Sequence, residues 1–403
     1  MEFVTPGKAR VAWRGELHLF STVASSAATN KPLIGSWIKF DQDVDRVSAV
    51  LDGFKHALEH PAPDTGWIYQ NNYRNVTNHP RFNFVQMRAV AQGLEREELQ
   101  ELHKGTLDAA IVDLHALAGL ARLNRNEIQG MANPMVRVAI ANLGLFASWE
   151  ALQAPGWDEP RLASLQRDWE QVDLLDGLER GIQSTRAYGL IIMQELRRAN
   201  GREFTELFGQ FVSTPADNSL VRLWSEQILP LAYKLTSLNE DGLFMLTQMS
   251  REVEATRLIK SGRPWPEVSA ISSNYWDQFE QKRAGDRFGR FLASRSWVPS
   301  WRALDVAVRA ETLRRLTITA IALKRYQLRY NQPAPSLSAL VPEFLGQVPF
   351  DPMSGKPLCY RLNPDGTFVL YSVGEDGKDD AGQGGNDLWT GPDAVWPRAV
   401  NDQ

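Results

Sequence analysis

The chain has 403 residues, a net charge of −4 at pH 7, and 43% hydrophobic and 23% charged residues. The length predicts two or three domains, since one core rarely serves so many residues, and the composition excludes intrinsic disorder and a collagen-like chain. The charge is unevenly placed, because residues 351–403 carry nine acidic and four basic side chains and the remainder is almost neutral. No basic surface of the kind that binds nucleic acid is predicted.

The sequence shows no pattern typical of a membrane span or a secretion signal. No stretch reaches the roughly 18 consecutive apolar residues of a spanning helix, and residues 1–5 have neither the basic start nor the apolar run of a signal peptide. As written, the chain is therefore expected to be soluble. The single Cys359 permits no internal disulfide, and within a predicted strand we expect a small buried apolar residue rather than a nucleophile.

Apolar residues at helical spacing dominate residues 41–300, which we predict to be a helical domain. Residues 1–40 lack a sustained period and predict an extended segment. A helical stripe then begins after Asp43 and is ended by Pro61; its members are Val47, Val50, Leu51, Phe54 and Leu58. Further helices are predicted over residues 82–102, 106–122, 133–153, 160–176, 178–199 and 219–236, with two or three more between 237 and 300. No fixed repeat recurs, so a bundle is predicted rather than a repeat array.

The pattern changes after a long helix predicted over residues 300–330. Residues 331–335 end that helix, and Ser336 is the expected N-cap of a short helical turn. Two alternating, β-rich runs, 358–362 and 367–371, then flank Asn-Pro-Asp-Gly and predict a hairpin. The predicted fold is mainly α: an N-terminal helical bundle, followed over residues 301–403 by a small α+β unit of long helix, antiparallel hairpin and Gly- and Asp-rich loop.

The order of these parts resembles the globular head of the type II secretion major pseudopilin. The matching pieces lie between residues 305 and 390 and are Lys324–Asn331, Ser336–Leu340, Val348–Pro352 and Leu370–Gly377. The resemblance implies a pilin-like head, export to the periplasm or cell envelope, and one bound calcium ion. It also implies that the chain begins after a removed signal or N-terminal anchor helix, which would be its contact with a membrane.

The chain departs from that family in one respect that bears on function. Pseudopilins carry an extreme N-terminal apolar helix that packs in a filament core, whereas this head follows some three hundred other residues. Filament assembly is therefore not implied. The helical part resembles uncharacterised bacterial envelope proteins that carry such a head, in the segments Ala57–Pro61, Gly105–Leu114 and Leu162–Gln166, and this second resemblance implies no chemistry.

The acidic loop 376–387 is the candidate calcium site. Calcium takes six to eight oxygen ligands, and the glycines of this loop allow backbone carbonyls to turn inward beside its carboxylates. By position, Asp376 and Asp387 resemble the ligand carboxylates of the pseudopilin head, with Asp379, Asp380 and Ser372 as further candidates. The loop is not an EF-hand, because Lys378 and Ala381 occupy positions where that motif needs a ligand and a glycine. The alternative is a solvated acidic turn without metal; a bound ion would act as a structural clip.

Two other patterns in the sequence are candidate sites. Residues 56–60 spell His-x-x-Glu-His, as in one class of zinc protease, but Pro61 ends the helix at once, which favours a solvated helix end with two chance histidines. Aromatic residues are concentrated in Trp67–Tyr73 and at Trp265, Tyr275, Trp276, Trp297 and Trp301. They could line a groove that binds a glycan or a peptide, but the simpler interpretation is that they fill the hydrophobic core.

Motifs of nucleophilic, nucleotide-binding or redox chemistry are absent from the sequence. Without such motifs we expect a non-catalytic protein that binds a protein or a surface polymer, and the resemblance implies that it is an exported or membrane-anchored envelope protein. Two alternatives stay open: an exported hydrolase with a site between helices, which a convergent, desolvated acid–base pair would favour, and a component of secretion or pilus assembly that works through the head.

Overall fold

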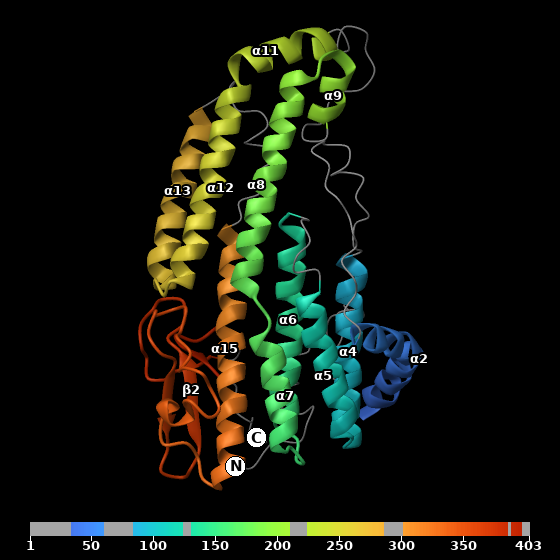
Figure 1. Cartoon of the computed structure of the whole chain (residues 1–403), viewed down its shortest axis with the longest axis vertical. Helices are drawn as coiled ribbons and strands as arrows, with labels where there is room; N and C mark the ends of the chain where they lie inside the picture. The colour runs from blue at the N-terminus through green and yellow to red at the C-terminus, as the bar shows by residue number, and fades with distance from the viewer. Residues whose placement is uncertain are drawn as a thin grey trace.

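The computed structural model of the protein describes residues 34–59, 84–123, 130–209, 224–285, 301–385 and 388–396. These residues form a mainly helical molecule with one small antiparallel sheet, which confirms the predicted fold class in its coarse form (Figure 1). Within these ranges, none of the helices combines the length and the hydropathy that a membrane crossing requires.

Most helices lie close to the predicted ranges, because their apolar residues repeat at the helical period. They are α4 (Phe84–Lys104), α5 (Leu107–Arg122), α6 (Ala132–Ala151), α8 (Leu174–Arg198), α12 (Leu238–Lys260), α13 (Trp265–Gly285) and α15 (Trp301–Tyr330). The helix predicted over residues 219–236 lies within the described residues only from Trp224 onward. That part consists of a π-helical turn, η1 (Trp224–Ile228), followed by the α-helix α11 (Leu229–Thr236). A short helix, α9 (Gly201–Gly209), had no counterpart in the prediction.

The helix predicted over residues 160–176 ends early. The first part is α7 (Glu159–Glu170), whose N-cap Asp158 accepts a hydrogen bond from the Arg161 backbone N–H at 3.0 Å. The chain then breaks before α8, and Asp173 lies at the break, where its carboxylate accepts a 2.6 Å hydrogen bond from buried Arg137. This ion pair between the break and α6 accounts for an interruption that apolar spacing does not reveal.

The first described helix differs from the prediction in its start and in the face that it buries. Helix α2 (Ile34–Glu59) begins nine residues before Asp43, so residues 34–40 are helical rather than extended; residues 1–33 lie outside the described ranges. Leu51 of the predicted stripe is buried and Leu58 is partly buried, but three members are exposed, Val47 at 42%, Val50 at 60% and Phe54 at 41%.

Lys55 explains the rotation of α2. It lies on the same face as Val44 and Leu51, and its ammonium group forms ion pairs of 2.9 Å with Glu97 of α4 and 3.0 Å with Asp113 of α5. These two carboxylates are buried, so pairing them with Lys55 contributes more to stability than burying the three exposed apolar side chains of the stripe would.

Helices α4, α5 and α6 pack together and α7 lies over them, with Trp169 at the centre of the contact. This side chain is fully buried, and its indole N–H donates to the Ser148 hydroxyl at 2.9 Å. The ring approaches α6 at Gly144, where an added Cβ would stand 2.6 Å from the ring and 3.1 Å from the Leu117 side chain. The helical core therefore depends on a residue without a side chain at this crossing.

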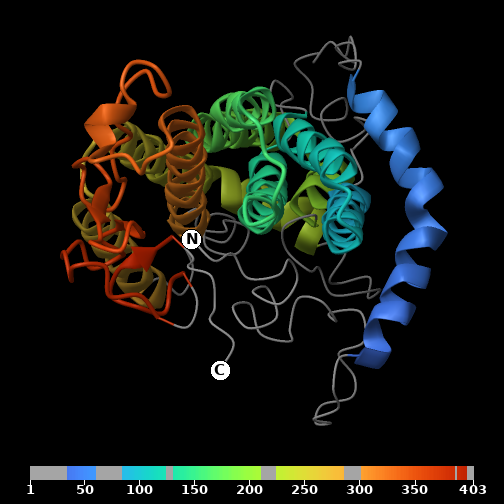
Figure 2. The ribbon, with the colours of Figure 1, turned by 90° about the horizontal axis from the view of Figure 1, so that it is seen from below.

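Helix α15 lies between the helical bundle and the sheet. It packs against α6, α7 and α8 and, on another side, against strand β2 (Phe368–Ser372), so it is buried on several sides (Figures 1 and 2). One continuous apolar core joins residues of the bundle, of α15 and of the sheet. Figure 2 shows α2 at one edge of the molecule and the sheet at the opposite edge.

Three charged residues of α15 fix its contacts. Burial alone would raise the pKa of the Glu311 carboxyl, but the guanidinium groups of Arg314 and Arg315 lower it to about 2. The two arginines also donate to backbone carbonyls, Arg314 to Trp169 at 2.9 Å and Arg315 to Phe350 at 2.8 Å. One charged cluster, in which two guanidinium groups share one carboxylate, thus connects α15 to the end of α7 and to the loop that precedes the sheet.

The predicted hairpin is confirmed, and a third strand completes the sheet. β1 (Cys359–Leu362) pairs with β2 (Phe368–Ser372) in antiparallel register, with Cys359 opposite Tyr371 and Leu362 opposite Phe368. β3 (Ala394–Val395) pairs with the end of β2.

The short helix η2 (Leu337–Leu340) follows Ser336, the expected N-cap. The Ser336 side chain does not cap the helix, because its hydroxyl lies 2.8 Å from that of Ser338.

Replacement of Gly144 by Ala is expected to destabilise the fold by about 1–3 kcal/mol, because the new methyl group meets the Trp169 ring and overpacks the core. Gly53→Ala in α2 is the matched control: a Cβ there meets nothing within 4 Å, so the gain in helix propensity should stabilise by about 0.5–1 kcal/mol. Chemical denaturation of both variants measures the difference, and equal effects would contradict this account of the crossing.

Replacement of Glu311 by Gln is expected to cost about 3–5 kcal/mol in the free energy of unfolding, because it leaves two partly buried arginines without their buried counter-charge. The same substitution at exposed Glu343, which pairs with Arg329, should cost less than about 1 kcal/mol. Urea unfolding at pH 7 compares the two, and a loss at residue 311 as small as that at residue 343 would argue against the cluster as the link between bundle and sheet.

Candidate functional site

The acidic loop after β2 is folded around a buried carboxylate that lies outside the predicted ligand set. Asp393 is fully buried, and its oxygens accept hydrogen bonds from the backbone N–H groups of Asp380 at 3.3 Å, Gly382 at 2.8 Å and Gln383 at 3.0 Å. Burial raises the pKa of the Asp393 carboxyl, while these three N–H groups act in the opposite direction. The loop therefore has a defined turn on its own, centred on one anion.

A second buried carboxylate, Asp351, holds the base of the loop. It accepts hydrogen bonds from the Ser372 hydroxyl at 2.7 Å and from the backbone N–H groups of Met353 at 2.9 Å and Val373 at 3.1 Å. Burial raises the pKa of Asp351 against the effect of these donors. The residue connects the segment before β1 to the end of β2, where the acidic loop begins.

Two glycines make the course of the loop possible. Gly374 has φ of 73°, and a Cβ there would lie 1.9 Å from the Pro392 carbonyl oxygen, so no other residue fits between the two ends of the loop. Gly382 has φ of 81°, and a Cβ there would lie 2.9 Å from the Val369 side chain. The glycine-rich character that predicted a curled loop therefore has a steric cause.

The predicted ligands are distributed unevenly over this loop. Asp376, Asp379 and Asp380 are exposed on it. One oxygen of Asp376 accepts from the Lys378 backbone N–H at 3.0 Å, and one oxygen of Asp379 accepts both the Tyr371 hydroxyl and the Ala381 N–H at 2.9 Å. Ser372 is buried and donates to Asp351, so its hydroxyl is committed elsewhere; Asp387 lies outside the described residues.

The carboxylates of this loop could bind a calcium ion only together with backbone carbonyl oxygens. Among the described residues, no three His, Cys, Asp or Glu side chains gather closely enough to hold a metal ion by themselves. Calcium accepts carbonyl oxygens as readily as carboxylates, and a loop with positive φ at Gly374, Gly377 and Gly382 can turn such carbonyls to one side. The side chains that remain suitable are Asp376, Asp379 and Asp380.

The loop also contacts the helical bundle. The turn between α12 and α13 lies against it, since a Cβ at Gly377 would stand 2.8 Å from the Pro266 ring. The same turn contacts the segment before β1, where the Trp265 backbone N–H donates to the Pro352 carbonyl at 3.0 Å. On the other side, Arg309 of α15 pairs with Glu375 and its guanidinium lies 5.6 Å from the centre of the Trp389 ring. The acidic loop is therefore packed between α15 and the α12–α13 turn.

The other two predicted patterns do not gather into sites within the described residues. His56 and Glu59 are exposed, and the His56 Nδ1 lies 3.5 Å from a Glu59 carboxylate oxygen at the end of α2, while His60 lies outside the described ranges. Of the aromatic set, Trp265 is buried in the core and Tyr275 lies under the Arg251 guanidinium at 4.0 Å. The other members of the set are not described: Trp67–Tyr73 and Trp297 lie outside the described ranges, and the side chains of Trp276 and Trp301 are not placed. Cys359 lies half-buried in β1, and burial raises the pKa of its thiol.

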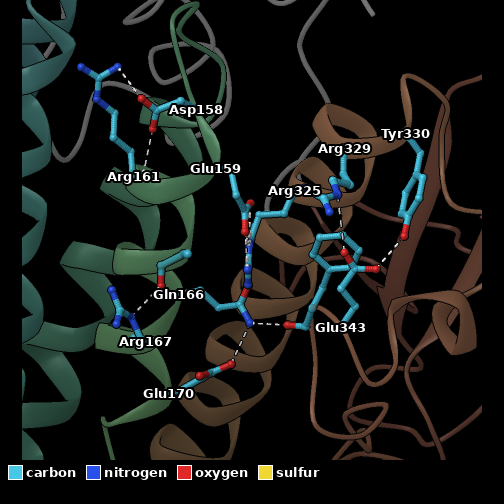
Figure 3. A network of polar contacts seen from close by, with 12 residues as sticks. Asp158, Glu159, Arg161, Gln166, Arg167, Glu170, Arg325, Arg329, Tyr330 and Glu343 are labelled. Atoms are coloured by element: carbon cyan, nitrogen blue, oxygen red, sulfur yellow. Dashed lines mark hydrogen bonds and ion pairs between the residues drawn. The ribbon is translucent and has the colours of Figure 1, made fainter.

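Charged residues at helix contacts were missed by the sequence patterns. Figure 3 shows the network in which Arg325 of α15 donates to Glu159 of α7 at 3.0 Å and to buried Gln166 at 2.9 Å. Gln166 in turn donates to the Phe344 carbonyl at 2.7 Å, which joins α7 to the segment after η2. Burial lowers the pKa of Lys324 to about 8, and its ammonium group donates to the Leu152 carbonyl. In sequence, each of these residues is indistinguishable from a solvated charge on a helix face.

No family model matches the chain, and no curated protein or solved structure is similar to it.

Replacement of Asp113 by Asn tests the buried cluster that orients α2. Burial raises the pKa of the Asp113 carboxyl to about 7, and Lys55 counteracts this only in part. The folded state thus binds a proton more tightly than the unfolded chain, so the free energy of unfolding falls as pH rises from about 4 to 7, by at most about 1.4 kcal/mol per pH unit. Asn removes this ionisation, and the variant should gain stability relative to the wild type as pH rises through that interval.

Asp52→Asn is the control, because exposed Asp52 pairs with the same Lys55 at 3.1 Å. Urea unfolding at half-unit steps from pH 4.5 to 8 gives the comparison. Stability curves of Asp113→Asn and wild type that stay parallel across this range would contradict a raised pKa at Asp113.

Proposed function

We propose that this chain is an exported, non-catalytic envelope protein that binds a protein or surface polymer, and that its C-terminal unit is a pseudopilin-like head stabilised by one calcium ion. The observation that carries the proposal is the acidic loop: it follows a hairpin packed on a long helix, and it is shaped by Asp393 and by glycines at positive φ. Helix, hairpin and acidic loop occur in the order expected of that head.

The contacts of the buried carboxylates among the described residues support a structural rather than a catalytic role. Buried Glu311 is neutralised by two arginines of its own helix, and buried Asp113 and Glu97 face Lys55. Each cluster lies at a contact between secondary-structure elements. Such groups serve packing and orientation, which suits a binding protein more than an enzyme.

The position of the loop supports calcium as a clip. A bound ion would be held by Asp376, Asp379, Asp380 and backbone carbonyls, with Asp387 as the further predicted ligand. It would supply charge neutralisation to a segment that carries four exposed acidic side chains, Glu375 included. Because the loop contacts both α15 and the α12–α13 turn, fixing it would stiffen the region where the bundle meets the sheet.

The test is thermal unfolding of the chelator-treated protein with added calcium, magnesium or zinc. A ligand bound by the native state stabilises by mass action, about 2.7 kcal/mol at a concentration 100 times Kd, so calcium should raise Tm and an equal concentration of magnesium should raise it less. The double variant Asp376→Asn/Asp387→Asn should lose the calcium response.

Asp365→Asn is the matched control, because this exposed carboxylate lies in the hairpin turn and accepts from the Thr367 N–H at 2.9 Å, away from the acidic loop. It should keep the calcium response. A wild-type Tm that calcium leaves unchanged would reject the calcium-bound head, and a zinc response that depends on His56 and His60 would move an enzyme to first place. Fractionation of the native cell, with the protein recovered only from cytoplasm, would reject the envelope assignment.

A further inference from the structure

Helix α11 crosses the end of the molecule that lies farthest from the sheet. Figure 1 shows it above the upper ends of α8 and α12, next to α9. Its inner face packs into a small separate core: Tyr233 is buried, lies 5.9 Å from the Phe204 ring, and donates its hydroxyl to Asp241 at 2.8 Å. Lys234 donates to the Asn200 side chain at 2.9 Å. The helix is thus fixed from below by α8, α9 and α12.

The outer face of α11 is aliphatic and uncharged. Ile228, Leu231 and Leu235 occur at i, i+3 and i+7, on the side opposite Pro230 and Tyr233, and they are 53%, 62% and 77% exposed. The other exposed residues of this stretch are Gln227, Ala232 and Thr236. No charged side chain interrupts this face between residues 227 and 236, apart from Lys234, which is turned toward Asn200.

The exposed stripe of α2 provides the contrast. Val47, Val50 and Phe54 also lie at i, i+3 and i+7, but exposed charged residues surround them, Arg46, Asp52 and His56 among them. The two stripes have similar apolar residues and differ in charge. An apolar surface that is free of charge and held rigidly at one end of the molecule needs a separate explanation.

The size and shape of the α11 face favour a lipid surface over another protein. Three large side chains on one helix are far fewer than the roughly 20–30 residues that each side contributes to a stable protein interface. A charged partner finds no complementary charge among the described residues of this face. A helix with an apolar outer face, lying across the end of the molecule, has instead the geometry of a helix that rests in the plane of a membrane interface.

We propose that the outer face of α11, formed by Ile228, Leu231 and Leu235, inserts into the interface of a lipid bilayer. The surrounding charges indicate which property of the membrane matters. Exposed Arg198 and Arg202 next to this end of the molecule are paired with Glu195 and Glu206, so they offer little net attraction to anionic lipid. Binding is therefore apolar, weak and reversible, and it is insensitive to salt.

Flotation of the full chain with phosphatidylcholine vesicles tests the proposal. The wild type should float with vesicles at millimolar lipid, equally at 50 and 500 mM salt, and Leu231→Gln/Leu235→Gln should reduce the bound fraction at least fivefold. Val47→Gln/Val50→Gln on α2 is the matched control, which should bind as the wild type does. Thermal unfolding of both double variants checks that each is folded.

A second readout reports on α11 directly. Leu235→Cys in a Cys359→Ser background, labelled with a polarity-sensitive fluorophore, should shift its emission to the blue when vesicles are added, whereas a label at Val50→Cys should not. Several results would overturn the proposal: a wild type that does not float, binding that needs anionic lipid and disappears in salt, or an equal loss in both Gln variants. Self-association that the α11 variant abolishes, without any flotation of the wild type, would assign the face to a second copy of the chain instead.

Discussion

The buried cluster of Glu311, Arg314 and Arg315 is the interaction on which the arrangement of the bundle and the sheet depends. Removing three charges from water is costly, and the cost is recovered only if each finds a partner. Here the carboxylate takes both guanidinium groups, and the remaining donors reach the carbonyls of Trp169 and Phe350. One turn of α15 thereby fixes the end of α7 on one side and the start of the sheet unit on the other. The apolar core, too, continues from the bundle into the sheet.

Much of the fold was predictable because it follows from local rules. Helix positions came from the 3.6-residue period, the start of α7 from Asp158 and Pro160, and the hairpin from alternation around Asn-Pro-Asp-Gly. The failures have long-range causes. Lys55 set the face of α2 through carboxylates more than forty residues away in sequence, and Arg137 stabilised the break at Asp173. β3 has two residues and forms because β2 offers it an edge, so no periodic pattern announces it.

The candidate site was predictable in its location and not in its construction. The run of Asp and Gly after β2 marked a curled acidic loop, but the organising anion is Asp393, which lies beyond that run and is buried. Ser372 has an oxygen and the right neighbourhood, yet its hydroxyl donates to Asp351. The spacing in the sequence shows which oxygen-bearing residues are near one another. It does not show which of these oxygens form hydrogen bonds with backbone N–H groups or with other side chains, because that depends on the folded backbone.

The two ends of the molecule are mechanically related through α12 and α13. Their turn contacts the acidic loop, where Pro266 packs against Gly377, and the segment before β1, where Trp265 donates a hydrogen bond to Pro352; the other end of α12 contacts α11 through Asp241 and Tyr233. The proposed calcium loop and the outer face of α11 therefore both lie against elements that α12 connects. An ion at one end and a surface contact at the other would then act on the same pair of helices.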